Sequence, residues 1–178
     1  LNFHILPHLF SNNYYDLKLK KERNKILSKY KKYKFLKGNI ENYNQLSKAV
    51  FKFKPKILIH LAAQAGVRYS LENPDIYLNS NILGTFNVIK VSDKIKVKHL
   101  IIGSSSSVYG ANKKIPFKEI DKTDNQISIY AASKKSTENL AHSYSSLWKL
   151  PVKILRFFTV SGPLSRPVIA YFKFKSKF

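Results

Sequence analysis

A parallel sheet is most clearly indicated by VKHLIIGSSSS, residues 97–107, which starts as a continuous apolar run and ends in four serines. Such a run is typical of a β-strand that is buried on both faces. On either side of it along the chain, KILIHLAA at 56–63 and VKILRFF at 152–158 have the same form. We therefore expect three parallel strands in this chain of 178 residues, of which the first two are buried.

Helical patterns separate the three strands. Residues 41–53 repeat apolar side chains at helical spacing, Asn73-Pro74 opens a helix that runs to about residue 89, and a third helix spans 130–149. A charged helix is expected at 18–30 and a further short strand at 33–38. Strands and helices that alternate in this way predict an α/β fold, a Rossmann-like doubly wound parallel sheet with helices on both faces.

Small and hydroxyl-bearing residues follow each predicted strand, at 62–66, 103–107 and 157–159. Parallel sheets place their ligand sites at the carboxyl ends of the strands. We therefore interpret these three segments as candidates for a ligand site. The alternative is that small residues only turn the chain after each strand.

The chain carries a formal net charge of +22 at pH 7, which is compatible with a nucleic acid or another anionic partner. Only four of its 32 basic residues are arginines, whereas nucleic-acid readers use arginine heavily. We therefore favour a lysine-rich composition over nucleic-acid binding. There is no cysteine for a disulfide or a thiolate metal site, and no apolar run of the ~20 residues that a membrane span needs. We expect no membrane insertion, no metal and a cytoplasmic location.

A tyrosine and a lysine four residues apart, Tyr130 and Lys134, stand at the start of the third helix. The spacing alone is uninformative, because it occurs six times in this lysine-rich chain. Only this pair opens a predicted helix at a suitable distance after a strand that ends in serines. Side chains at i and i+4 share one face of a helix, so we expect Lys134 to approach Tyr130.

Six segments, in the same order along the chain, carry a resemblance to a known family: NNYYDLKLKKER (12–23), HLAAQAGVRYSLENP (60–74), NSNILGTFNVI (79–89), SSSSVYGANKKIPF (104–117), YAASKKSTE (130–138) and LRFFTVSGP (155–163). They resemble the NAD-dependent epimerase/dehydratase family of extended short-chain dehydrogenases/reductases. Within that family the chain looks most like the UDP-glucuronate 4-epimerases.

The resemblance implies that Tyr130 is the general base, with Lys134 and the nicotinamide cation favouring its phenolate form. It implies that Ser105 relays the proton of the sugar hydroxyl, with Ser106 beside it, although which of the four serines does so stays open. Family dehydratases carry an Asp-Glu pair where this chain has Ser106-Ser107, which favours epimerisation over dehydration. The implied reaction interconverts UDP-glucuronate and UDP-galacturonate through a 4-keto sugar with bound NAD.

The resemblance also implies the ligand contacts. Its cofactor-binding positions are Asn39, Ile40, Ala62, Ala63, Gln64, Asn81, Tyr130, Lys134 and Phe157. Its substrate-binding positions are Ser105, Ser106, Thr159 and Arg166. A guanidinium fork at Arg166 would suit the carboxylate of the sugar, and the alternative is a solvated loop arginine. The family commonly forms homodimers through helices that include the one carrying Tyr130.

The chain departs from the family at both ends. The first strand with its Gly-x-x-Gly-x-x-Gly phosphate loop has no counterpart, and most of the C-terminal substrate domain is missing. We expect an unmatched segment at 1–11, a partial NAD-binding domain at 12–163 and the start of a substrate-binding region at 164–178. The alternatives are an inactive fragment or gene remnant, the sister activity on UDP-galactose, and a basic nucleic-acid- or anion-binding protein.

Overall fold

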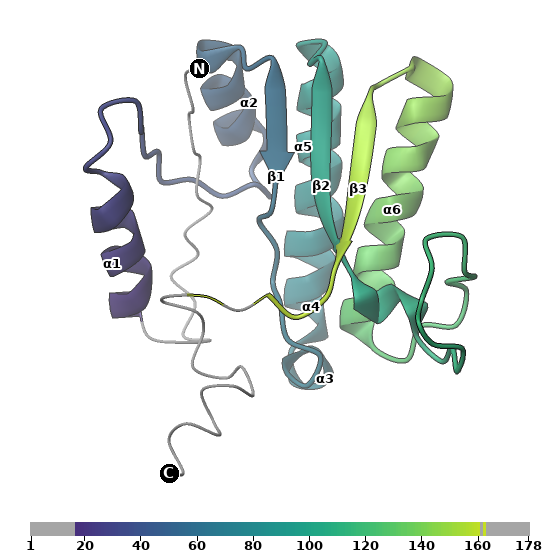
Figure 1. Ribbon diagram of the computed structural model, residues 1–178. Coiled ribbons are helices and arrows are strands. Elements are labelled where there is room, and N and C mark those ends of the chain that lie inside the picture. Colours follow the sequence, from purple (N-terminus) through teal and green to yellow (C-terminus); the bar gives the residue numbers. More distant parts are fainter. Residues whose placement is uncertain (1–16, 161, 163–178) are drawn as a thin grey trace. The chain divides into compact units, whose positions relative to one another are not determined.

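The computed structural model describes residues 17–160 and residue 162 (Figure 1). Arg166 and the segments predicted at 1–11 and 164–178 lie outside the described residues. The chain divides into two compact units, of which Gly38–Phe158 is one. The described part of the other unit contains helix α1 (Leu17–Leu27), which agrees with the charged helix predicted at 18–30 and has no buried residue.

Three parallel strands form the sheet of the Gly38–Phe158 unit: β1 (Ile57–His60), β2 (His99–Ser105) and β3 (Val152–Phe157). They lie side by side in the order β1-β2-β3 (Figure 1). Ile57 pairs with His99 at the start of β1, and Ser105 pairs with Phe157 at the far end of β3. The three strands predicted from the sequence are therefore confirmed, and their carboxyl ends meet at one edge of the sheet.

The longer helices of this unit are α2 (Tyr43–Phe53), α5 (Gly84–Lys94) and α6 (Ile129–Trp148). Side-chain caps start two of them: Asn42 accepts a hydrogen bond from the Gln45 amide at 3.0 Å, and Ser128 accepts one from the Ala131 amide at 3.1 Å. Such caps satisfy backbone donors that have no partner inside the helix. The three helices predicted from the sequence are present within a few residues of their expected bounds.

The helix predicted to open at Asn73-Pro74 has three parts. It follows the short helix α3 (Tyr69–Glu72) and consists of α4 (Pro74–Tyr77), a π-helical turn η1 (Leu78–Leu83) and α5. A π turn is wider than an α turn and often occurs at functional sites. Here it carries Asn81, a residue that the resemblance assigned to the site.

The hydrophobic core lies between the sheet and helices α5 and α6, which both lie on one face of the strands (Figure 1). Its buried members are Ile40, Val88, Ile89, Val97, Leu100, Ile102, Ala141 and Leu150. Alternate side chains of a strand point to opposite faces, so Leu100 and Ile102 of β2 pack against the helices together. None of the described helices is both long and apolar enough to cross a membrane.

The expectation that residues 56–63 form a strand buried on both faces is wrong for the described residues. Ile57, Ile59 and Leu61 are 53%, 57% and 62% exposed, whereas His60 is buried. The physical reason is the period of two along a strand: one set of side chains faces α5, and the other set points away from the helix layer. A continuous apolar run predicts a strand but does not report which face is covered.

The strand predicted at 33–38 is not formed as a ladder. Only Phe35 makes a single bridge, and its neighbours on either side are irregular. Strand geometry requires consecutive backbone pairing with a neighbouring strand, and alternation of apolar residues does not supply that partner. The serines at the end of β2 lead into one 3₁₀ turn, η2 (Ser106–Tyr109).

Candidate active site at the carboxyl ends of the strands

Tyr130 lies in the first turn of α6, two residues after the Ser128 cap, and is half-buried. Its ring packs edge-on against the ring of Tyr77, with the ring centroids 6.0 Å apart. Tyr77 is fully buried and donates its hydroxyl proton to the carbonyl oxygen of Gly66 at 2.6 Å. The ring of Tyr130 is therefore held by a side chain that is itself fixed to the loop after β1.

Lys134 follows one turn later on α6 and is buried. Its Nζ donates a hydrogen bond to the carbonyl oxygen of Gly103, in β2, at 2.7 Å. Burial lowers the pKa of Lys134 to about 8, against an opposing effect of the Glu138 carboxylate, which raises it. The helix thus brings this ammonium to the end of β2, where the serines begin.

The first two serines of the run point to opposite sides of the sheet. Ser104 is buried and donates its hydroxyl proton to Oε1 of Glu138 at 2.6 Å. The Oγ of Ser105 accepts a hydrogen bond from the Ser107 amide at 3.2 Å and so begins η2. Ser106 is half-buried in that turn. The pleat of β2 therefore gives Ser104 and Ser105 different partners although they are adjacent in sequence.

Asn81 joins the loop after β1 to the start of α6. Its Oδ1 accepts from the Gln64 amide at 2.7 Å, and its Nδ2 donates to the Gln64 carbonyl at 3.0 Å. Its Nδ2 also donates to the hydroxyl of Ser133 at 2.9 Å, and that hydroxyl donates to the carbonyl of Tyr130 at 2.8 Å. Both N–H groups of this fully buried amide are used inside the protein, so Asn81 fixes the backbone on which Tyr130 stands.

The other predicted cofactor positions lie in two places. Ala62 and Ala63 are half-buried in the loop after β1, next to the buried Gln64. Asn39 accepts a hydrogen bond from the Glu41 amide at 2.8 Å, which closes a turn. Ile40 belongs to the core and lies so close to Gly84 that a Cβ there would come within 2.6 Å of its Cδ1.

Phe157 ends β3 beside Ser105 and is partly exposed. A Cβ on Gly103 would lie 3.5 Å from its ring and 3.0 Å from the side chain of Leu61, so these residues meet on the face of the sheet away from the helices. Thr159 is exposed and belongs to the other unit.

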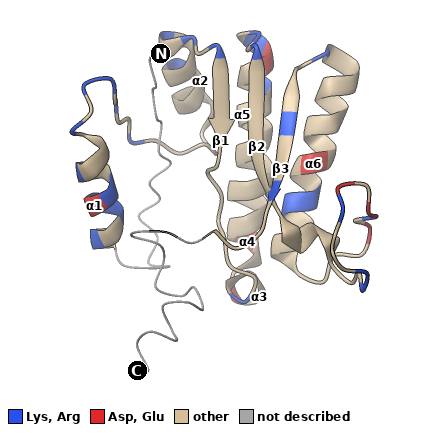
Figure 2. Cartoon of the chain, viewed as in Figure 1, with Lys and Arg blue, Asp and Glu red and all other residues tan. Residues whose placement is uncertain are grey.

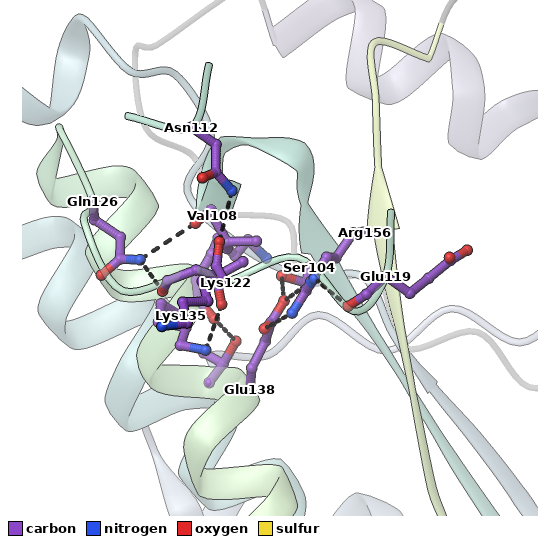
Figure 3. Close-up of polar contacts among 12 residues, drawn as sticks. Ser104, Val108, Asn112, Glu119, Lys122, Gln126, Lys135, Glu138 and Arg156 are labelled. Atoms are coloured by element: carbon purple, nitrogen blue, oxygen red, sulfur yellow. Dashed lines mark hydrogen bonds and ion pairs between the residues drawn. The ribbon is translucent and has the colours of Figure 1, made fainter. Parts of the chain in front are cut away.

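A buried ion pair was not predicted from the sequence. Glu138 accepts from Nε of Arg156 at 3.0 Å through Oε1 and from its NH2 group at 2.9 Å through Oε2 (Figure 3). The carboxylate raises the pKa of Arg156 above its usual value. An arginine near the end of a largely apolar strand and a glutamate one turn after Lys134 were the signals that could have identified the pair.

The arrangement is suited to proton transfer. A phenol, an ammonium and a hydroxyl, from Tyr130, Lys134 and Ser105, are carried by elements that meet at the carboxyl ends of parallel strands. Among the described residues, no three His, Cys, Asp or Glu side chains lie together in a group that could hold a metal ion.

The parallel sheet, with helix-borne Tyr130 and Lys134 at its strand ends, defines a Rossmann-like α/β protein. The model of the NAD dependent epimerase/dehydratase family matches residues 4–173. The chain therefore belongs to that family.

One relative and two solved structures illustrate the similarity. The chain is 48% identical to a probable UDP-glucuronate 4-epimerase of Rhizobium meliloti over 161 residues, which are 90% of this chain and 47% of the relative. It superposes on the Bacillus cereus UDP-glucuronic acid 4-epimerase, solved with UDP-glucuronic acid and NAD, with a TM-score of 0.80 and 33% identity over 87% of this chain and 48% of that one. A UDP-galactose 4-epimerase gives a TM-score of 0.73 and 26% identity over 83% of this chain and 48% of that one. The chain thus spans about half the length of the relatives it matches.

Proposed function

We propose that this chain carries the proton-transfer part of a nucleotide-sugar 4-epimerase that interconverts UDP-glucuronate and UDP-galacturonate. The observation that carries the proposal is the placement of Tyr130 and Lys134 in the first two turns of α6, with Lys134 bonded to the end of β2. The similarity to the Bacillus cereus enzyme, which is greater than that to the UDP-galactose enzyme in both identity and TM-score, supports the choice of sugar.

The residues present fit an NAD cofactor. The alanines after β1 have small side chains that allow a ligand to approach their backbone closely, and Gly103 lies against Leu61 and Phe157, where a Cβ would come within 3.0 Å of Leu61. We propose that Asn39, Ile40, Ala62, Ala63, Gln64, Lys134 and Phe157 hold NAD, and that residues 12–163 are its domain. When bound, NAD would accept a hydride from C4 of the sugar and return it to the other face of that carbon.

Tyr130 accepts the proton of the 4-hydroxyl. The charge of Lys134 stabilises the phenolate form of Tyr130, which is the form that accepts this proton. We assign the proton relay to Ser105, because the hydroxyl of Ser104 already donates to Glu138 on the helix side of β2. Ser106 would lie beside the relay in η2. Thr159 and Arg166 would bind the sugar, with the guanidinium of Arg166 on its carboxylate.

The test compares two tyrosines with the same spacing to a lysine. Tyr130→Phe should reduce formation of UDP-galacturonate by more than about 100-fold, whereas Tyr30→Phe, at an exposed tyrosine four residues before Lys34, should leave it unchanged. The assay is chromatography of UDP-glucuronate incubated with NAD and either this chain or a hybrid in which residues 17–160 replace the matching part of the Rhizobium meliloti relative. Equal activity of the Tyr130→Phe and parent hybrids would contradict the proposal.

The same assay separates the alternatives. Activity in the hybrid but not in the isolated chain would identify the chain as an inactive fragment with competent residues. Turnover of UDP-galactose without turnover of UDP-glucuronate would assign the sister activity. A basic nucleic-acid-binding protein would instead show DNA binding that falls steeply with salt and is unaffected by Tyr130→Phe. Figure 2 shows Lys and Arg on α1 and α2, at the amino ends of β1 and β2, and on α5, β3 and α6, so in the Gly38–Phe158 unit they are not confined to one element.

We also propose that the protein forms a homodimer through α5 and α6. Phe86 and Tyr144 pack edge-to-face with centroids 6.2 Å apart, and Tyr144 packs on Trp148 at 4.4 Å. Trp148 and Leu147 remain 52% and 68% exposed, an apolar surface suited to a second copy. Light scattering during gel filtration should give twice the chain mass, and Trp148→Asp should give the monomer.

A cytoplasmic location stays a proposal, to be tested by cell fractionation.

A further inference from the structure

Glu138 lies one helical turn after Lys134 and is buried, yet the proposed reaction does not use it. Its carboxylate accepts one hydrogen bond from Ser104 and two from Arg156 (Figure 3). A buried carboxylate is costly unless it is paired in this way, so its retention at this point requires a reason beyond packing.

The contacts fasten α6 to two strands at once. Lys134 and Glu138, on one face of the helix, bind the consecutive residues Gly103 and Ser104 of β2. Arg156 of β3 stands opposite Ser104 in the sheet and completes the pair with Glu138. The carboxyl ends of β2 and β3, where Ser105 and Phe157 follow, are thereby held at a fixed distance from Tyr130 and Lys134.

Arg156 extends the connection to the segment after η2. Its NH1 group donates to the carbonyl of Glu119 at 3.1 Å, and its guanidinium lies 5.0 Å from the ring centroid of Tyr109. In the same region, Lys135 donates to the hydroxyl of Thr123 at 2.6 Å (Figure 3). The pair of Glu138 and Arg156 therefore connects α6, both strand ends and this segment.

We propose that Glu138 is a positioning residue for the site. Its carboxylate holds the ends of β2 and β3 against α6. It thereby determines where Lys134 and the strand-end serines lie, and whether Lys134 carries its charge. The inference rests on the proposed roles of Tyr130 and Lys134. A buried ammonium keeps its charge only where a negative charge is near, and Glu138 opposes the lowering of the Lys134 pKa that burial causes. The other titratable groups around this turn are Tyr130 on α6, Arg156 on β3 and Tyr109 on η2.

The test measures the titration of Lys134 directly and does not require epimerase activity, so its failure is distinguishable from failure of the proposed function. Competitive acetylation of the full chain, read by mass spectrometry over pH 6–11, gives the labelling midpoint of each lysine. In the parent chain the midpoint of Lys134 should lie near 8, well below the ordinary lysine value of 10.5. A midpoint at the ordinary lysine value would show that the contact with Gly103 is not formed, and would overturn the inference.

The decisive variant is Glu138→Gln, which keeps the shape and removes the charge. We expect the midpoint of Lys134 to fall, so that its unprotonated fraction at pH 7 rises by about threefold or more. Asp93→Asn removes the same charge from an exposed ion pair with Lys96 and should leave the Lys134 midpoint unchanged. A folded Glu138→Gln chain with an unshifted midpoint would contradict the proposal.

Two further variants keep the test decisive. Glu138→Asp retains the charge on a shorter side chain and should restore most of the midpoint. If Glu138→Gln does not fold, Glu138→Gln combined with Arg156→Gln removes the unpaired guanidinium and should show the same downward shift. If both of these unfold while Asp93→Asn folds, Glu138 supports the fold rather than positions Lys134, and the proposal fails.

Discussion

The two faces of the three-stranded sheet are both apolar in sequence, but they differ in what covers them. On the face towards α5 and α6, Leu100 and Ile102 of β2 are almost fully buried. On the other face, Ile57 and Ile59 of β1 are more than half exposed among the described residues. The difference shows that burial here comes from the helices and not from the strand sequence.

The same difference separates the polar residues at the strand ends. Ser104 and Arg156 point to the helix face and are bound by Glu138. Their strand neighbours Ser105 and Phe157 alternate to the face away from the helices, where Phe157 also lies near Gly103. The covered face therefore carries the groups that hold the site together, and the open face carries those that we propose meet the ligands.

The largest expected effect compares one substitution on the two faces. Ile102→Ala should lower the free energy of unfolding by about 3 kcal/mol, because it leaves a cavity between β2 and the helices. Ile59→Ala, on the neighbouring strand but on the open face, should cost less than about 1 kcal/mol. Urea unfolding followed by circular dichroism measures both. Equal losses would mean that the open face is covered in solution.

The second prediction concerns Lys134 on the covered side. Its pKa is about 8 in the folded chain and 10.5 as the ordinary value, so folding releases a proton between these two pH values. The unfolding free energy should therefore rise with pH from about 8 to 10.5, by about 2–3 kcal/mol more in the parent than in Lys134→Met. Guanidinium unfolding at several pH values checks this difference, and parallel pH dependences in the two chains would disprove it.

The third prediction compares two asparagines. Asn81→Ala should cost about 2 kcal/mol, because it leaves the Gln64 backbone and Ser133 without their buried partner. Asn112→Ala removes one exposed hydrogen bond, to the carbonyl of Lys122, and should cost less than about 1 kcal/mol. Thermal melts of the two variants rank them. A loss for Asn81→Ala no greater than for Asn112→Ala would argue against a stabilising link by Asn81 between the loop after β1 and α6.

The smallest effect on stability belongs to the open face. Ile59→Thr should change the unfolding free energy by no more than about 0.5 kcal/mol, because the side chain is exposed and threonine suits a strand. It should also reduce association, since it interrupts an exposed apolar patch. Light scattering against concentration measures that association, and an unchanged scattering curve would indicate that this face does not self-associate.

Local patterns were sufficient for much of the architecture. The apolar runs predicted β1, β2 and β3, and the sequence pattern of residues 130–149 predicted α6, because these features depend on neighbours in the chain. The strand expected at 33–38 failed for the opposite reason: pairing needs a partner strand, and only Phe35 makes a bridge. Prediction was reliable where the physical cause is local.

The site divides in the same way. The sequence by itself determined that a tyrosine and a lysine share one face at the start of a helix that follows a serine-ended strand. It left open which serine faces which way, and it gave no role to Glu138 or Arg156. Only the tertiary structure decided that Ser104, and not Ser105, is bound to Glu138, because the pleat of β2 and the position of α6 set a contact between residues 34 positions apart.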